Sequence, residues 1–264
     1  MKLELEGKRA LVSGSTAGIG LAIAAGLAAE GAEVVLNGRT EGRVAGAVGL
    51  VLGRHPGARV RGVAADLGTA EGCARIVREV PEVDVLVNNL GVFAAVPFEE
   101  IPDAEWTRFF EVNVLSGVRL ARAYLPGMKV RSWGRVLFIS SESALQIPVE
   151  MIHYGTTKTA QLAVSRGLAE TTRGTGVTVN AILAGPTRSE GVETFVEGLA
   201  ARRGVSPAQV ERDFFSTARP TSLLQRFATP EEVAALAVFV ASAPASAVNG
   251  AALRVDGGVV RAIV

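Results

Sequence analysis

The chain has 264 residues, of which 48% are hydrophobic and 30 are glycines, enough to bury a sizeable core in one large α/β domain or two small ones. Its formal net charge is +1 and no block of like charge stands out, which argues against nucleic acid and acidic membrane surfaces as partners. Cys73 is the only cysteine, and His55 and His153 are the only histidines, so an intrachain disulfide is excluded and no metal site is expected. The charged N-terminus is unlike a secretory signal, and the longest apolar run, which starts at Val233, is too short for a bilayer. We expect a cytoplasmic protein.

Short apolar strands alternate with helical patterns along the chain. The first strand, "RALVSG", is followed by a helix, "IGLAIAAGLAAEG", that Gly31 closes. Six further strands are predicted at "AEVVLNG", "RVRGVAAD", "VDVLVNN", "GRVLFISS", "VTVNAILAG" and "GAALRVDGG", and further helices over 41–52, 70–79, 103–125, 153–172 and 230–241. This alternation predicts an α/β, doubly wound (Rossmann-type) fold, a seven-stranded parallel sheet with helices on both faces, in a single domain over 1–264.

One segment interrupts the alternation. Between about 186 and 228 no strand is evident, and two helical stretches are inserted, "GVETFVEGLAARRG" and "SPAQVERDFFS". A long excursion in a compact domain is often a functional loop. We interpret this segment, called the insert below, as a substrate lid; the alternative is a surface elaboration.

A glycine-rich turn, "SGSTAGIG", joins the first strand to the first helix. Gly14 permits a tight turn, Gly18 lets backbone approach a pyrophosphate, and Gly20 permits close packing of helix and sheet. The helix N-terminus offers unpaired N–H groups to an anion, and Ser15 and Thr16 can add hydroxyl donors. The spacing is G-x3-G-x-G rather than G-x-G-x-x-G, but the strand before it and the helix after it predict a dinucleotide site.

Two other strand ends support this site. Asp66 follows the third strand and can hydrogen-bond an adenine ring. The fourth strand ends in "NNLG", where Asn89 and Gly91 can line the adenosine side; the alternative is an ordinary asparagine-rich turn. Carboxyl ends of parallel strands meet at one sheet edge, which is where doubly wound folds bind ligands.

Tyr154 and Lys158, in "YGTTK", lie four residues apart at the start of a predicted helix, so both side chains lie on one face. Alone, such a pair is commonly solvated. Together, "SGSTAGIG", "NNLG" and "YGTTK" resemble the TGxxxGxG, NNAG and YxxxK motifs of the short-chain dehydrogenase/reductase family, in its single-domain branch of roughly 250 residues. The resemblance covers nearly the whole chain and includes 3-oxoacyl-carrier-protein reductases. Ser13, Leu90 and Ala184 depart from the usual Thr, Ala and Pro, and Leu90 is the one expected to affect how the cofactor is seated.

The resemblance implies the roles of four residues. Tyr154 is expected to be the general acid/base, Ser141 the hydroxyl that orients the carbonyl, and Lys158 the partner of Tyr154 that also holds the nicotinamide ribose. The backbone of Asn113 is expected to hold a water that relays protons from Lys158. Ser140 is expected to point to the other side of the strand end. A phenol titrates near ~10, and a nearby ammonium is expected to lower that pKa.

The resemblance also implies the cofactor-binding residues and an NAD(P)-dependent carbonyl/alcohol oxidoreductase. The expected cofactor-binding residues are Gly14, Ser15, Thr16, Gly18, Ile19, Gly20, Arg39, Asp66, Leu67, Asn89, Gly91, Tyr154, Lys158, Gly185 and Thr187. The substrate pocket is expected to be largely apolar and lined by Phe93, Ala94, Ser143, Leu145, Val149, Thr187 and the insert. His153 is not expected to shuttle protons, because adjacent helix residues point about 100° apart. The roles of Glu142 and Glu150 stay open.

Three other functions compete with this interpretation. One is 3-oxoacyl-carrier-protein reductase, with Lys129, Arg131 and Arg173 as a patch for an acidic partner. Another is a dinucleotide-sensing regulator without turnover, which an intact Ser141–Tyr154–Lys158 set argues against. Sugar-nucleotide epimerases share the glycine turn but usually need a larger C-terminal substrate region.

The second strand indicates which cofactor is bound. An acidic residue at its end marks NAD, whereas a nearby arginine marks the 2′-phosphate of NADP. Here Gly38 occupies the acidic position and Arg39 follows, so we expect NADP. Against this, Ala17 stands where many NADP-using relatives carry a second basic residue, and Arg39 can stack on the adenine of either cofactor.

We also expect a homo-oligomer, most simply a homotetramer, mainly from the family resemblance. The long helices over 103–125 and 153–172 carry more apolar residues than one buried stripe needs. The apolar C-terminal "ALRVDGGVVRAIV" suits a second two-fold contact.

Overall fold

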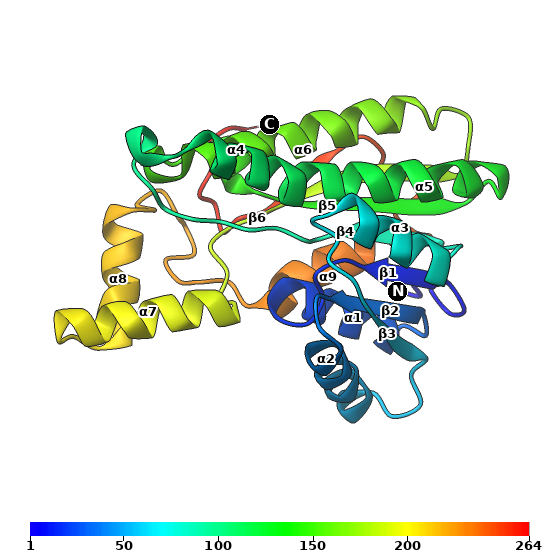
Figure 1. Ribbon diagram of the computed structural model, residues 1–264, viewed down its shortest axis with the longest axis horizontal. Coiled ribbons are helices and arrows are strands. Elements are labelled where there is room, and N and C mark those ends of the chain that lie inside the picture. Colours follow the sequence, from blue (N-terminus) through cyan, green and yellow to red (C-terminus); the bar gives the residue numbers. More distant parts are fainter. Residues whose placement is uncertain (264) are drawn as a thin grey trace.

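The computed structural model describes residues 1–263 and contains one seven-stranded sheet in which every pairing is parallel (Figure 1). The strands are β1 (Arg9–Val12), β2 (Glu33–Gly38), β3 (Val60–Ala64), β4 (Val85–Asn88), β5 (Gly134–Ser141), β6 (Val177–Ala184) and β7 (Ala252–Val255). Their order across the sheet is β3-β2-β1-β4-β5-β6-β7. All seven predicted strands are present, and the order reverses between β1 and β4, which places a ligand crevice beyond their carboxyl ends.

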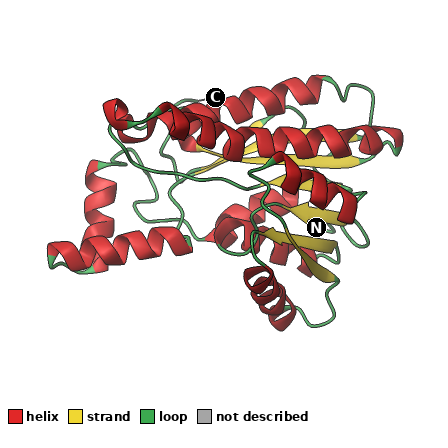
Figure 2. Ribbon diagram, viewed as in Figure 1, coloured by secondary structure: helices red, strands yellow, loops and turns green. Residues whose placement is uncertain are grey.

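Helices cover both faces of the sheet (Figure 2). They are α1 (Gly18–Ala29), α2 (Glu41–Arg54), α3 (Ala70–Glu79), α4 (Asp103–Phe110), α5 (Ser116–Val130), α6 (Ile152–Glu170), α7 (Glu190–Arg203), α8 (Pro207–Thr217) and α9 (Pro230–Val240). Helices α1, α2 and α9 pack on one face, and α3, α5 and α6 pack on the other. The doubly wound α/β fold predicted from the sequence is therefore confirmed.

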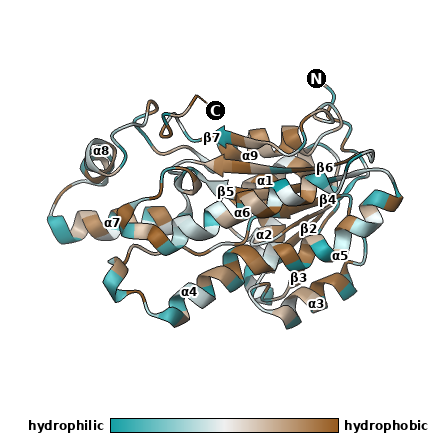
Figure 3. Cartoon of the chain, turned by 90° about the horizontal axis from the view of Figure 1, so that it is seen from above, coloured by the Kyte–Doolittle hydropathy of each residue, from teal (hydrophilic) through white to brown (hydrophobic). Residues whose placement is uncertain are grey.

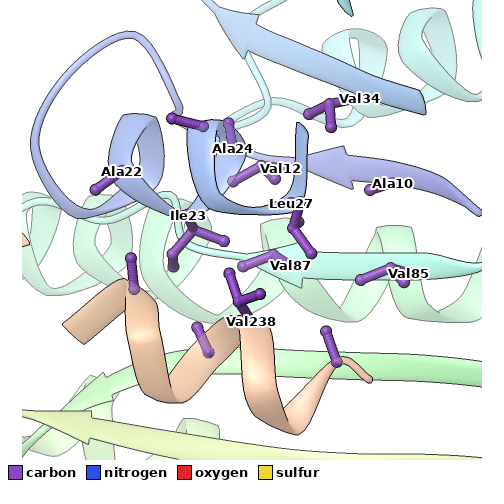
Figure 4. Close-up of a cluster of buried hydrophobic side chains, with 14 of the residues drawn as sticks. Ala10, Val12, Ala22, Ile23, Ala24, Leu27, Val34, Val85, Val87 and Val238 are labelled. Atoms are coloured by element: carbon purple, nitrogen blue, oxygen red, sulfur yellow. The ribbon is translucent and has the colours of Figure 1, made fainter. Parts of the chain in front are cut away.

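Alternation along the strands builds a separate core on each face. In β1, Val12 packs with Ile23 and Leu27 of α1 and with Val238 of α9 (Figure 4), whereas the neighbouring Leu11 packs on the opposite face. Because both faces are covered, β5 and β6 are buried along their whole length. Brown, hydrophobic residues predominate in the central strands of the sheet (Figure 3).

Cys73 of α3 belongs to the core on the face that α3, α5 and α6 cover. It is 3% exposed, its Sγ donates to the Leu67 carbonyl at 3.3 Å, and burial raises the pKa of its thiol to about 11. The thiol is therefore protonated and shielded from solvent at neutral pH.

The single helix predicted over 103–125 is interrupted in the structure, so this prediction is wrong in part. The chain forms α4, then a π-helical turn η2 (Glu111–Leu115), then α5, which extends to Val130. A π-helical turn adds a residue to the helical repeat, and such turns often occur at functional sites. This one contains Asn113, whose side chain is 1% exposed.

The insert forms α7 and α8, the two helices that its sequence predicts, and they project from one end of the sheet (Figure 1). Ser189 and Ser206 cap them by accepting from backbone N–H groups, and Gly204 ends α7 in a left-handed conformation. The insert has its own small apolar cluster, formed by Val196, Ala200, Val210, Phe215 and Phe227. This cluster makes the insert a packed unit.

Short helical turns complete the chain, and they are η1 (Phe98–Glu100), η3 (Glu142–Ala144) and η4 (Val149–Met151). Among residues 1–263, none of the helices combines the length and the apolar character needed to cross a membrane.

Candidate active site

The glycine turn between β1 and α1 has the backbone that the sequence predicts. Gly14 and Gly18 have φ values of +58° and +54°, which side chains disfavour. Gly20 has no room for a side chain, because an added Cβ would lie 2.4 Å from Asn89 Nδ2 and 2.6 Å from the Gly14 carbonyl oxygen. Helix α1 begins at Gly18, so its free N–H groups face the turn.

Two of the residues predicted to bind the cofactor hold this turn in place. Ser15 is fully buried; its hydroxyl donates to the Val12 carbonyl at 2.7 Å and accepts from the Asn37 N–H at 2.9 Å. Asn89 donates through Nδ2 to the carbonyls of Ser13 and Gly14, at 3.0 and 2.9 Å. Backbone carbonyls therefore accept from the Ser15 hydroxyl and from the Asn89 amide in this structure, and the cofactor contacts of these two residues stay a prediction.

A cavity of about 760 Å³ lies beyond the carboxyl ends of β1, β2 and β3. It is lined by Gly14, Thr16, Asn37, Gly38, Arg39, Thr40, Arg43, Ala65, Asp66, Leu67, Leu90, Glu190, Gly191 and Thr194. Of the predicted cofactor residues, Gly14, Thr16, Arg39, Asp66 and Leu67 are on this wall, and Leu90 is there too. A glycine-rich turn, a free helix N-terminus and a cavity of this size fit the phosphates and adenosine of a dinucleotide.

The cavity wall also includes a basic residue that the sequence analysis did not predict to bind the cofactor. Arg43 of α2 lies beside Arg39 on the wall, and its Nη2 donates to Glu190 Oε2 of α7 at 2.7 Å. This ion pair connects the dinucleotide-binding half of the chain to the insert. Both side chains are more than half exposed, so the pair contributes little to stability.

The other two predicted cofactor residues at a strand end, Gly185 and Thr187, follow β6. Thr187 Oγ1 donates to the Gly185 carbonyl at 2.9 Å, and Thr187 pairs with Ala228, which closes the base of the insert. An added Cβ at Gly185 would lie 2.6 Å from the Asp256 carbonyl oxygen, so only glycine fits beside the end of β7.

Tyr154 and Lys158 lie on α6, opposite the end of β5, and share one helix face. The Lys158 ammonium donates to the Ile139 carbonyl at 2.9 Å and to Gln161 Oε1 at 3.2 Å, and lies 5.6 Å from the centre of the Tyr154 ring. Gly91 lies against it, since an added Cβ there would be 3.5 Å from Lys158 Nζ. Gly91 directly follows Leu90, which is on the cavity wall.

Asn113 and Gln161 surround the inner side of Lys158. The Asn113 amide donates to the Val92 carbonyl at 3.0 Å and to Thr157 Oγ1 at 2.9 Å. Its backbone carbonyl, predicted to hold a relay water, accepts from Gln161 Nε2 at 2.6 Å. Gln161 therefore bridges Lys158 and Asn113. The sequence analysis missed Gln161, although its position one helical turn after Lys158 places both side chains on the same helix face.

The two serines at the end of β5 point to different partners, as predicted. Ser140 Oγ donates to the Lys158 carbonyl at 3.0 Å, whereas Ser141 Oγ donates to Glu142 Oε2 and accepts from the Ser143 N–H at 3.1 Å. Glu142 Oε1 in turn accepts from Arg219 Nε at 3.1 Å. The sequence did not indicate Arg219, which follows α8.

The pKa of Tyr154 differs from the expectation. Burial, then the negative charge of Glu142, raises the pKa of the Tyr154 phenol above its ordinary value, and Ser141 and Arg219 act in the opposite direction. Burial lowers the pKa of Lys158 to about 8. The expected lowering of the Tyr154 pKa by Lys158 is therefore wrong, because burial dominates and the ammonium faces a carbonyl and an amide instead.

His153 lies apart from the pair, as predicted. It is 1% exposed and packs between aromatic rings, with its ring centre 6.0 Å from that of Trp106 and 4.0 Å from that of Phe109. Phe93, a predicted pocket residue, contacts Tyr154 edge to face at 6.4 Å. Leu145 and Val149, two further predicted pocket residues, are 49% and 82% exposed.

The low pKa of Lys158 makes stability depend on pH. The unfolded lysine has a pKa of ~10.4, so between about pH 8 and ~10 the unfolded chain binds more protons than the folded one. We expect the free energy of unfolding in urea to rise with pH over this range, and Lys158→Met to lose that rise. Lys129→Met, which removes a lysine hydrogen-bonded to Thr171 near the surface, should keep it. An equal pH slope in the parent and in Lys158→Met would contradict the prediction.

Comparison with known proteins identifies the family. The sequence profile of the short chain dehydrogenases matches residues 8–199. The chain belongs to the short chain dehydrogenase family. It is accordingly an oxidoreductase, as are its relatives.

Three family members illustrate the similarity. The oxidoreductase YvaG of Bacillus subtilis is 51% identical over 263 residues, covering 100% of both chains. D-beta-hydroxybutyrate dehydrogenase of Cupriavidus necator is 35% identical, covering 96% of this chain and 98% of its own. The structure of L-sorbose reductase from Gluconobacter frateurii, complexed with NADPH and L-sorbose, is 34% identical with a TM-score of 0.93 and 100% coverage of both chains.

Proposed function

We propose that this family member is an NADP(H)-dependent oxidoreductase that interconverts a carbonyl and a secondary alcohol, with Tyr154 as general acid/base. The observation that carries the proposal is that Tyr154 and Lys158 of α6 lie opposite the end of β5, which carries Ser141, and that Gly91, next to Leu90 of the cavity wall, lies against the Lys158 ammonium. The bound nicotinamide supplies or accepts the hydride. The chain itself binds, orients and handles the proton.

Tyr154 provides the proton for carbonyl reduction. Its raised pKa keeps the phenol protonated at neutral pH, which suits a donor to an oxygen that gains negative charge. Ser141 lies within the same site and provides a second polar group for that oxygen. Giving up this proton leaves a phenolate, which a positive charge at Lys158 favours. In the reverse direction that phenolate accepts the alcohol proton.

Lys158 has a binding role as well as an electrostatic one. Its ammonium is 5% exposed and is held by the Ile139 carbonyl and by Gln161, on the side next to Gly91. We assign it to the ribose hydroxyls of the nicotinamide half. Gln161 and Asn113 fix its position, since Gln161 bridges the lysine and the Asn113 carbonyl.

NADP is favoured over NAD by two arginines on the cavity wall. Arg39 and Arg43 both line the adenosine end, and the acidic residue that binds the NAD ribose is replaced by Gly38. Gly38 also leaves little space for an acid, because an added Cβ would lie 2.4 Å from Thr16 Cγ2. The L-sorbose reductase structure contains NADPH, which agrees with this assignment.

A substrate panel tests the proposal. L-sorbose, acetoacetate and an acetoacetyl thioester are offered with NADPH, and oxidation of the cofactor is followed by its absorbance. We expect turnover of at least one ketone, and turnover that is about 10²- to 10⁴-fold slower in Tyr154→Phe. NADPH binding without turnover of any ketone would favour the dinucleotide-sensing regulator instead.

The role as a 3-oxoacyl-carrier-protein reductase loses the support of its proposed basic patch. Arg131 is neutralised by Glu82 and Asp84, and Lys129 donates to Thr171. Lys129 is in the last turn of α5 and Arg131 lies between α5 and β5, so both are near the amino end of β5, whereas Tyr154 lies near its carboxyl end. A carrier protein docked on this patch is therefore at the wrong end of the sheet.

A homo-oligomer, most simply a homotetramer, is also proposed, and an apolar groove between α5 and α6 supports it. The groove has a volume of about 400 Å³ and is lined by Val118, Ala121, Arg122, Leu125, Pro126, Lys129, Val164 and Leu168. We expect light scattering at micromolar concentration to give a mass near four times 27.4 kDa, and Val164→Glu to lower it. A monomeric parent protein would contradict this prediction.

A further inference from the structure

The insert reaches the dinucleotide-sized cavity through the first turn of α7. Glu190, the first residue of α7, lines the cavity together with Arg39 and Arg43. Ser189, which caps α7, lies against the glycine turn, since an added Cβ at Gly18 would be 3.3 Å from Ser189 Cβ. The start of the insert is therefore part of the wall that carries the two arginines.

Two acidic side chains are on this wall, Asp66 and Glu190, and they differ in their partners. Asp66 Oδ1 accepts from the Gly68 N–H at 3.0 Å, within its own turn. Glu190 Oε2 instead accepts from Arg43 Nη2 of α2 at 2.7 Å. The side chains of Arg43 and Glu190 are 56% and 61% exposed, so a ligand in the cavity can reach both. Glu190 is therefore the acidic group that already holds one of the two arginines.

A bound 2′-phosphate needs the same arginine. A phosphate monoester carries a charge of about −1.5 to −2 at neutral pH, and arginine binds such a group through paired N–H donors. In the structure one of the Arg43 donor nitrogens is directed to Glu190. A phosphate that takes this donor separates the ion pair, and a carboxylate that stays beside the phosphate repels it. Either event opposes the binding of a 2′-phosphate.

We propose that Glu190 is a specificity residue that competes with the 2′-phosphate of NADP(H) for Arg43, and so weakens the binding of NADP(H) without affecting that of NAD(H). The inference rests on the proposed binding of NADP(H) with its 2′-phosphate at Arg39 and Arg43. Its structural consequence concerns the insert. Bound NADP(H) separates the ion pair between α2 and α7, whereas NAD(H), which has no 2′-phosphate, leaves it intact.

A ribose-binding role for Glu190 predicts the opposite result. An acidic residue can accept hydrogen bonds from the adenosine ribose of NAD, and Gly38 leaves the end of β2 without such a residue. In that role, removal of the Glu190 charge would weaken the binding of NADH. The pairing of its Oε2 with Arg43 favours competition, and the sign of the effect distinguishes the two roles.

The experiment measures the dissociation constants of NADPH and NADH for the full chain, by fluorescence titration at low ionic strength and without substrate. We expect Glu190→Gln to bind NADPH about two- to fivefold more tightly than the parent, the range for an exposed ion pair, and to bind NADH as the parent does. The gain should shrink at about 0.5 M salt, because salt screens exposed charges.

Glu193→Gln is the matched control. Glu193 is also in the first turn of α7 and is exposed, but it is not on the cavity wall. The variant removes the same charge from the same helix end, and its two dissociation constants should equal those of the parent. In an Arg43→Leu background, Glu190→Gln should change NADPH binding less than twofold, because the arginine for which the two groups compete is absent.

The ratio of the two dissociation constants decides the outcome. If Glu190→Gln leaves this ratio as in the parent, or weakens the binding of NADH, the inference is overturned. An equal gain for both cofactors would also overturn it, because a looser insert affects both alike. A parent that binds NADH more tightly than NADPH contradicts the proposed cofactor instead, so the two failures are separate results.

Discussion

Tyr154→Phe should lower kcat by about 10² to 10⁴-fold, the range by which a positioned acid or base accelerates a reaction. The substitution removes only the hydroxyl, so the ring can keep its edge-to-face contact with Phe93 and the helix can keep Lys158 in place. NADPH affinity, measured by fluorescence titration, should therefore change little. The combination of lost turnover and retained binding distinguishes a proton-transfer role from a structural one.

Tyr124→Phe is the control for this prediction. Its hydroxyl donates to the Val80 carbonyl at 2.8 Å in the core beside α3, so the variant should lose about 1 kcal/mol of stability. Its turnover should equal that of the parent. Turnover by Tyr154→Phe at the parent's rate would remove Tyr154 from the mechanism.

Arg39→Leu should lower kcat/KM for NADPH about 10- to 100-fold and leave kcat/KM for NADH nearly unchanged, because a charged hydrogen-bonding partner of the 2′-phosphate contributes about 1.5–3 kcal/mol. Arg43→Leu should have a smaller effect in the same direction, since Arg43 is shared with Glu190. The double variant Arg39→Leu/Arg43→Leu should have the lowest ratio of kcat/KM for NADPH to kcat/KM for NADH.

Arg54→Leu is the matched control, because Arg54 is on the same helix α2 but is not on the cavity wall. Introducing an acid at position 38 is a less direct test, since a side chain there would displace Thr16. A parent protein that prefers NADH, or an Arg39→Leu variant that loses both cofactors equally, would remove Arg39 from this role.

The sequence predicted the parts of the molecule that depend on local patterns. The alternation of apolar strands and helices determined all seven strands, and α3 has the predicted bounds Ala70–Glu79. The glycine turn was predicted because its backbone requirements are local, with positive φ values at Gly14 and Gly18. Tyr154 and Lys158 were placed on one face by helical spacing alone.

The interactions that the sequence did not predict join distant segments. Glu142 and Arg219 are 77 residues apart, and Arg43 and Glu190 are 147 residues apart. No local pattern distinguishes these arginines from the many arginines on the surface. The environment of Tyr154 was missed for the same reason, because its pKa depends on burial and on a carboxylate placed there by tertiary packing.

The buried state of Cys73 makes the chain convenient for chemical labelling. Its thiol is 3% exposed with a pKa of about 11, so a maleimide at neutral pH has no reactive target in the parent chain. Arg202, exposed near the end of α7, can then be replaced by cysteine to give one attachment point on the insert. A fluorophore there follows the insert in solution as NADPH is added, and an Arg43→Leu background measures how much of that response passes through the Arg43–Glu190 ion pair.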